Sequence, residues 1–318
     1  MSDEPTWVRR FTAPTIEQIA WAPGAPERVA AVTTEDGSFQ AWSWDLGTGA
    51  RSRASLGGVG AEEVHLLPDG SGVVWWYDEL GDERGRWLVT PFGGSSAEPL
   101  VPGVPDGWMS GISLTDHGVA VGIATDEDYR VYVGRPGEEP AERYRHERPA
   151  GVGSEWPQGR GGLAPDGSLL CLHHAERGDI DHPALRVLDA ATGETLGDQV
   201  DPDLRLEAGA WAPVAGDHRL AFTQERAGID RPAVWDLGSG ERADLTLDDL
   251  EGPVVAVGWT PDAARLVAHH DPGGGVQRLL AIEPATAGVG VLVTVDGTIH
   301  EAGFRPDGAL WYRTDSSA

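Results

Sequence analysis

Two histidine pairs are the first residues in this sequence whose side-chain chemistry suggests a site. His173-His174 and His269-His270 each begin eight residues after a proline, at Pro165 and Pro261, so they occupy equivalent positions in a repeat. Imidazole nitrogens bind metals and transfer protons near neutral pH. Adjacent residues of a strand face opposite sides, however, so one pair cannot chelate one ion. We therefore expect a structural role for these histidines and no metal site.

Signatures of known catalytic sites are absent. No serine stands in Gly-x-Ser-x-Gly, the turn that exposes the nucleophile of many hydrolases. The sequence has no phosphate-binding Gly-x-x-x-x-Gly-Lys and no His-Glu-x-x-His, and Cys171 is its single cysteine. We expect no cofactor and no catalytic residue. An enzyme with its own central site of histidines and aspartates is a further interpretation, which requires convergent polar groups in one pocket.

Three polar segments place arginines near glycines between predicted strands, at 78–86, 176–183 and 225–232. In one interpretation each arginine pairs with a neighbouring carboxylate. In the other, the arginines dock a partner or bind a peptide carboxylate through two parallel hydrogen bonds. The loop Glu155-Trp156-Pro157 is a further candidate contact site if Trp156 is exposed. The alternative is that Trp156 is buried between sheets. The candidate substrate- or partner-facing residues are Arg84, Arg86, Arg177, His182, Arg226, Arg231, Glu155 and Trp156.

A repeat indicates which elements must position these residues. An aromatic or apolar residue, any residue and then proline, often followed by Asp-Gly, returns every 45 to 50 residues. Blades of β-propellers repeat about every 40–50 residues. The sequence therefore predicts an all-β, seven-bladed β-propeller of four-stranded antiparallel blades, as a single domain over 1–318. The seven markers stand at Pro23, Pro68, Thr115, Pro165, Pro213, Pro261 and Pro306.

Turn chemistry assigns each marker a place in the blade. Proline fixes φ, aspartate accepts hydrogen bonds from its own turn and glycine takes positive φ, so Pro-Asp-Gly joins the first strand to the second. A second marker, Asp-x-x-Thr/Ser-Gly, begins at Asp45, Asp189 and Asp236 and joins the third strand to the fourth. Only 12 residues follow Pro306, so we expect the seventh blade to be incomplete. We hypothesise that Trp7–Thr12 adds a strand there and closes the ring.

Composition excludes some partners. The formal net charge of −27 opposes binding to nucleic acid and to anionic membranes. No run of 18 apolar residues is present, and Met1–Pro5 lacks the basic and apolar regions of a signal peptide. We expect a cytoplasmic protein.

With the repeat and the loops in view, the chain resembles the N-terminal propeller of bacterial serine peptidases of the prolyl oligopeptidase family, which includes acylaminoacyl-peptidases. The resemblance covers essentially the whole chain. It rests on the repeated Trp-x-Pro and Pro-Asp-Gly markers and on the segments 82–87, 155–157, 182–187, 231–236 and 310–314.

In that family a second domain, an α/β-hydrolase, carries the Ser-Asp-His triad, and the propeller covers the active site and filters substrates by size. This sequence contains no such domain. The resemblance therefore implies a non-catalytic gating domain for peptides, whose partner is a hydrolase domain missing from this chain. The alternative is a free-standing propeller that binds a protein or peptide.

Overall fold

The computed structural model describes residues 13–57, 59–153, 161–177 and 180–316. Every regular element within these ranges is a β-strand, so the expected all-β class is confirmed. The chain divides into two compact units, Met1–Met109 and Ser110–Ala318. A single domain over 1–318 stays a prediction. Over the same ranges, no helical segment has the length and apolar character that crossing a bilayer requires.

The first unit holds two groups of antiparallel strands that share one core. Ala30 and Val32 of the first sheet pack with Val64 and Trp75 of the second. The strands of this unit are β1 (Ile16–Ala22), β2 (Ala25–Thr33), β3 (Gln40–Asp45), β4 (Arg51–Arg53), β5 (Val64–Leu66), β6 (Gly72–Asp78), β7 (Arg84–Pro91) and β8 (Glu98–Pro99).

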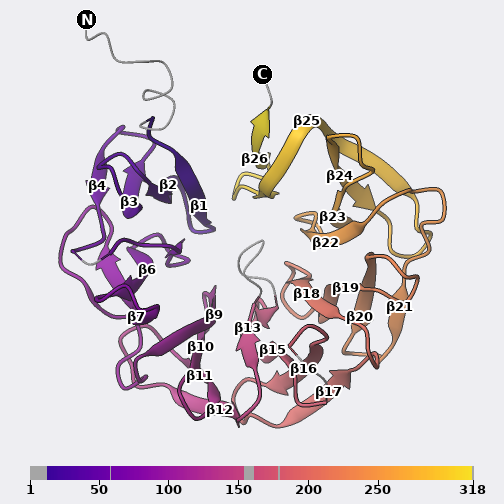
Figure 1. The fold of residues 1–318 in the computed structure, drawn as a ribbon, viewed down its shortest axis with the longest axis horizontal. Coiled ribbons are helices and arrows are strands. Elements are labelled where there is room, and N and C mark those ends of the chain that lie inside the picture. Colours follow the sequence, from indigo (N-terminus) through magenta and orange to yellow (C-terminus); the bar gives the residue numbers. More distant parts are fainter. Residues whose placement is uncertain (1–12, 58, 154–160, 178–179, 317–318) are drawn as a thin grey trace, which may run out of the picture. The chain divides into compact units, whose positions relative to one another are not determined.

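The second unit continues the pattern with further groups of strands, which follow one another in chain order (Figure 1). Its strands are β9 (Gly107–Thr115, which begins in the first unit), β10 (Gly118–Ala124), β11 (Tyr129–Gly134), β12 (Ala141–His146), β13 (Ala150–Val152), β14 (Gly162–Leu163), β15 (Leu169–His174), β16 (Ala184–Asp189), β17 (Thr195–Gln199), β18 (Leu206–Trp211), β19 (Arg219–Gln224), β20 (Arg231–Asp236), β21 (Arg242–Asp244), β22 (Val254–Trp259), β23 (Leu266–His270), β24 (Val276–Ile282), β25 (Val289–Phe304) and β26 (Leu310–Ser316).

Consecutive groups of strands in this unit also share their cores. Val131 of β11 packs with Leu172 of β15, and Leu185 of β16 packs with Phe222 of β19. Strands covered on both faces lose the alternation of apolar and polar residues, and all seven residues of β10 are buried. Small antiparallel sheets stacked in chain order through shared cores form a propeller-like arrangement, as the repeat predicts.

The predicted hairpin turns are confirmed. Each Pro-centred marker lies between two neighbouring antiparallel strands, from β1 and β2 to β25 and β26. In the turn after β5, the Gly70 amide donates to the Leu67 carbonyl at 2.7 Å, and the Ser71 amide donates to Asp69 Oδ1 at 2.9 Å. Aspartate and glycine thus have the roles that the turn chemistry assigns to them.

The second marker is also where the sequence places it, between the third and fourth strands. At Asp45, the carboxylate accepts from the Thr48 amide at 2.8 Å and the carbonyl accepts from the Gly49 amide at 2.8 Å. The turns that begin at Asp189 and Asp236 form the same glycine bond, also at 2.8 Å. Each of these three turns joins a pair of antiparallel strands.

The prediction of seven separate four-stranded blades is wrong for the hydrogen-bonded sheets. The described strands form five sheets, of four, eight, five, four and five strands. β7 pairs with β9 at Arg84 and Gly85, which merges the second and third repeats into the eight-stranded sheet. β25 pairs with both β24 and β26, so the incomplete seventh repeat extends the fifth sheet. The proposed closing strand, Trp7–Thr12, lies outside the described residues.

Candidate functional site

A cavity of about 460 Å³ lies in the second unit, among residues of β9, β11, β13, β15 and β18 and the loops beside them. Most of its wall is apolar, with a few polar side chains. The apolar wall includes Pro149, Ala150, Ala175, Ile180, Pro183, Leu206 and Ala208, and the polar side chains are those of Ser110, Tyr129, His173, Arg205 and Glu207.

Close backbone packing brings the first strands together beside the cavity. The Ser110 hydroxyl of β9 donates to the carbonyl of Ala150 in β13 at 2.7 Å. The next residue, Gly111, has a φ of 94°, and a Cβ there would overlap the carbonyl oxygen of Val152. Only glycine accepts both the backbone conformation and this approach. The two strands can therefore form one wall of the cavity.

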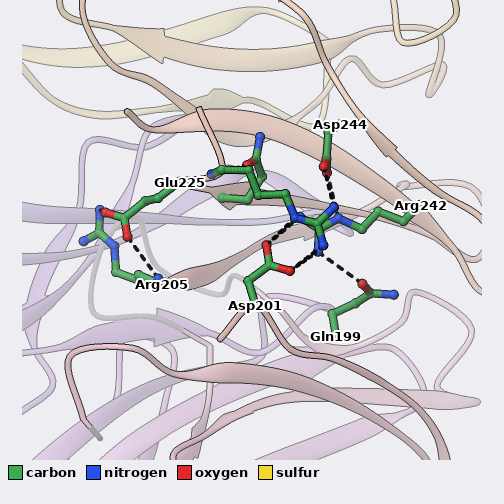
Figure 2. Close-up of polar contacts among 8 residues, drawn as sticks. Gln199, Asp201, Arg205, Glu225, Arg242 and Asp244 are labelled. Carbon is green, nitrogen blue, oxygen red and sulfur yellow. Dashed lines mark hydrogen bonds and ion pairs between the residues drawn. The ribbon is translucent and has the colours of Figure 1, made fainter. Parts of the chain in front are cut away.

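Arg205 is the cationic group of the cavity. Its Nη2 donates to both carboxylate oxygens of Asp230, at 2.9 and 3.1 Å, and lies 3.6 Å from Glu225 Oε1. Its backbone amide donates to Glu225 Oε2 at 3.0 Å (Figure 2). Burial acts to lower the pKa of Arg205, but the bond to Asp230 and the charges of Asp230, Glu207 and Glu225 outweigh it and raise the pKa. The guanidinium is therefore charged and fixed in orientation.

His173 gives the cavity a neutral polar group. Its Nδ1 donates to the Gly153 carbonyl at 2.9 Å, so Nε2 carries no proton in the neutral ring and can accept a hydrogen bond. Burial lowers the pKa of His173, and the bond to Gly153 opposes this shift only in part. The imidazole is therefore uncharged at neutral pH.

The other paired histidines have separate surroundings. His174 is fully buried, and its Nδ1 accepts from the Glu176 amide at 3.4 Å. His269 Nε2 lies 3.0 Å from Gln277 Oε1, and His270 Nε2 donates to the Glu251 carbonyl at 2.7 Å. Within the described ranges, no three His, Cys, Asp or Glu side chains gather as a metal would require.

Two of the predicted candidates lie in the first unit. The Arg84 guanidinium stacks on the Trp108 ring, with 4.6 Å from its carbon to the ring centroid. Arg86 Nη2 donates to Asp106 Oδ2 at 2.5 Å, and both side chains are about half exposed. Both residues therefore have partners within the chain.

The remaining candidates belong to the second unit. Arg177 forms a 3.5 Å ion pair with Asp198, and His182 is half-buried. Arg231 is buried and donates to the carbonyls of Gly252 and Leu250, at 2.7 and 2.8 Å, so it holds a loop. Glu155 and Trp156 lie outside the described residues. Contact of these candidates with a substrate or partner stays a prediction.

The last candidate, Arg226, belongs to a network centred on Asp201. Figure 2 labels Asp201, Arg242 and Asp244 of this network. Asp201 has a 2% exposed side chain and receives two hydrogen bonds from each of two arginines. Arg226 donates at 2.5 and 2.9 Å, and Arg242 donates at 2.9 Å to both oxygens. Asp244 accepts from the same two arginines. The network ties the 225–232 loop to the segment before β18, and so holds the carboxylates that bind Arg205.

Sequence reasoning found part of this site. The segments 176–183 and 225–232 do supply Ile180 and Pro183 to the wall and Glu225 and Asp230 to Arg205. Ser110, Tyr129, Arg205 and Glu207 were missed. The alternation of charged and apolar residues over 204–208 is the one signal that could have indicated Arg205 and Glu207, since it exposes their side chains on one face of a strand.

No family model and no curated protein matches this sequence. Among solved structures, a chain of the mitotic checkpoint complex is 14% identical with a TM-score of 0.61, covering 100% of this chain and 93% of that one. Oligopeptidase B from Leishmania major is 12% identical with a TM-score of 0.63, covering 96% and 45%. A putative TolB from Agrobacterium tumefaciens is 13% identical with a TM-score of 0.54, covering 96% and 91%. At these identities the likeness shows a shared fold.

Proposed function

We propose that this chain is a non-catalytic propeller domain that binds peptides and controls their access to the active site of a cytoplasmic serine peptidase similar to prolyl oligopeptidase. The cavity beside β9, β13 and β18 is the observation that carries this proposal. The resemblance of the turn and loop segments to that peptidase family supports it. So does the likeness to oligopeptidase B, of which the chain covers 45%.

The size and wall of the cavity suit a short peptide segment. Ligand pockets commonly have volumes of about 300–1,000 Å³, an apolar lining and a few placed polar groups. Ile180 and Pro183, which are both at least partly exposed, offer apolar contact to a side chain. His173 Nε2 can accept from a peptide N–H, and so can Ser110 Oγ, whose own proton is donated to the Ala150 carbonyl. The Tyr129 hydroxyl can donate to a peptide carbonyl.

Fluorescence anisotropy with labelled peptides of four to eight residues tests the proposal. We expect Arg205→Gln to weaken binding about tenfold, because the loop carboxylates lose their partner and the wall loosens. Arg265→Gln is the matched control, since it makes the same charge change at an exposed residue outside the cavity wall and should bind as wild type. Equal affinities for both variants, or peptide hydrolysis by this chain alone, would contradict the proposal.

A free-standing propeller that binds a protein or peptide is the second candidate. The checkpoint-complex chain and the putative TolB favour it, because this chain covers more than nine-tenths of each. The intact mass of the protein in its native source separates the two candidates. A mass near 33.7 kDa supports the free-standing propeller, and a mass about twice as large supports the peptidase domain.

A further inference from the structure

Residues 289–295 of β25 form the fourth strand of the sixth repeat and differ in charge from the fourth strands of the other described repeats. β4, β8, β12, β17 and β21 each carry at least one Arg, Asp or Glu, and β8 also ends in proline. Charges and prolines on edge strands prevent pairing with other chains. Residues 289–295 of β25, Val-Gly-Val-Leu-Val-Thr-Val, contain neither.

This segment also has an open edge. β24 pairs with residues 289–296 on one side, whereas β26 pairs only with residues from Gly297 onward. The other edge of 289–295 therefore has no partner strand within the described ranges. Its side chains are accessible, with exposed fractions of 41% for Val289, 60% for Val291 and 41% for Leu292.

A bulge does not set this strand apart. Leu292 has no partner in the register with β24, and Leu196 of β17 is unpaired in the same way in its own sheet. Both leucines are exposed, at 41% and 50%. The two strands differ in that β17 also carries Asp198, so the missing charge remains the distinguishing feature.

We propose that residues 289–295 of β25 pair edge to edge with the same segment of a second copy of this chain, forming a twofold-symmetric dimer. An antiparallel pairing centred on Leu292 places Val291 opposite Val293 of the second copy and Val289 opposite Val295. β-Branched residues opposite one another stabilise antiparallel pairs.

The sequence of the segment fits a second copy as the occupant, because residues 289–295 can pair with themselves without placing any charge opposite another. Two chains of net charge −27 repel wherever carboxylates meet. In this register no charged residue lies within the paired segments, and Asp296 at the end faces Gly288 of the second copy. The contact therefore uses a part of β25 where approach brings no like charges opposite each other.

The small area buried by one pair of strands limits the affinity of the dimer. One strand pair buries less area than the roughly 1,200 Å² at which stable interfaces begin, so we expect a dissociation constant on the order of tens of micromolar. The twofold pairing uses the open edge of residues 289–295 in each of the two copies. No open edge of this segment is then left for a third copy, so association stops at the dimer.

Sedimentation velocity of the full chain from about 5 to 200 µM tests the proposal, and wild type should shift from monomer to dimer over this range. Leu292→Glu places carboxylates at the twofold axis and should weaken the dimer at least about tenfold. The structurally equivalent Leu196→Glu should leave dimerisation unchanged. Far-ultraviolet circular dichroism checks that both variants remain folded.

Oxidative cross-linking tests the register. Residues opposite each other in antiparallel strands have Cα atoms about 4.5–5.5 Å apart, within reach of a disulfide. Leu292→Cys should therefore give a covalent dimer, whereas Leu196→Cys should stay monomeric, and the buried Cys171 does not compete. A monomer at all concentrations overturns the proposal and leaves a strand of another protein as the occupant. Growing aggregates, or a dimer that resists Leu292→Glu, overturn it as well.

Discussion

Replacing Asp201 by asparagine tests whether the buried ion network holds the loop beside the cavity. The Asp201 carboxylate receives all four of its hydrogen bonds from Arg226 and Arg242. An amide is close to a carboxylate in shape, but it has no charge and only one accepting oxygen. The substitution therefore removes charge and acceptors with little change in volume.

The expected cost follows from the exposure of the two arginines. Breaking a buried ion pair costs about 3–5 kcal/mol when the remaining charge stays buried. Arg226 is 49% exposed and regains water, whereas Arg242 is 10% exposed and keeps its 2.7 Å bond to Asp244. We therefore expect Asp201→Asn to lower the free energy of unfolding by about 2–3 kcal/mol at neutral pH.

The pH dependence of this loss has a definite sign. Burial acts to raise the pKa of Asp201, but the bonds from Arg242 and Arg226 outweigh it and hold the pKa below 3.8. A carboxylate with a depressed pKa contributes stability that is complete above its unfolded pKa and is lost as pH falls through its folded pKa. The difference between wild type and Asp201→Asn should therefore be full at pH 7 and should shrink below pH 3.8.

Urea unfolding followed by tryptophan fluorescence, at neutral pH and near pH 3, measures both effects. Asp244→Asn is the control, because Asp244 contacts the same arginines but its side chain is 29% exposed. Pairs this exposed contribute about 1 kcal/mol or less. The reasoning is refuted if Asp201→Asn costs no more than Asp244→Asn, or if its cost is undiminished in acid.

Two further predictions concern strand packing and a second buried carboxylate. Gly111→Ala should destabilise the chain by more than about 3 kcal/mol in thermal or urea unfolding, because the new Cβ overlaps the Val152 carbonyl. Gly37→Ala, with a similar φ of 84° and open space around it, should cost only about 1 kcal/mol, and equal costs would contradict this account. Hydrogen bonding from Arg130, helped by Thr125 and Arg145, lowers the pKa of Asp128 to about 2 against the opposing effect of burial. Carboxyl NMR titration should give that value in wild type and a higher one in Arg130→Gln, and an unchanged value would refute the assigned cause.

The sequence predicts the turns of this fold better than the sheets. The turn at Asp45 is closed by groups three and four residues apart, so its geometry follows from local residue types. The number of sheets depends on pairing between distant residues, such as Arg84 with Trp108. It also depends on β25, which runs without interruption from Val289 to Phe304 and so joins the sixth repeat to the seventh. Neither feature has a local signal.

The difference between local and long-range contacts also explains which residues of the candidate site the sequence could predict. Polar loops near repeated glycines indicated where functional side chains could lie, but the partners of the arginines are distant in sequence. Arg86 binds a carboxylate 20 residues away, and Arg226 binds one 25 residues away. Ser110, Tyr129 and Arg205 meet only because different groups of strands pack side by side. A single repeat, considered alone, contains no information about that packing.

The 16-residue strand β25 also has a consequence for local opening. Terminal hairpins ordinarily fray, and their amide hydrogens exchange with solvent far faster than those of the core. Here the continuous strand β25 pairs with β24 through its first half and with β26 through its second half, and Gln277 Oε1 of β24 accepts from the Ile299 amide at 2.6 Å. We therefore expect the amides of β24, β25 and β26 to open together in hydrogen exchange, as one cooperative unit that protects the last described strand.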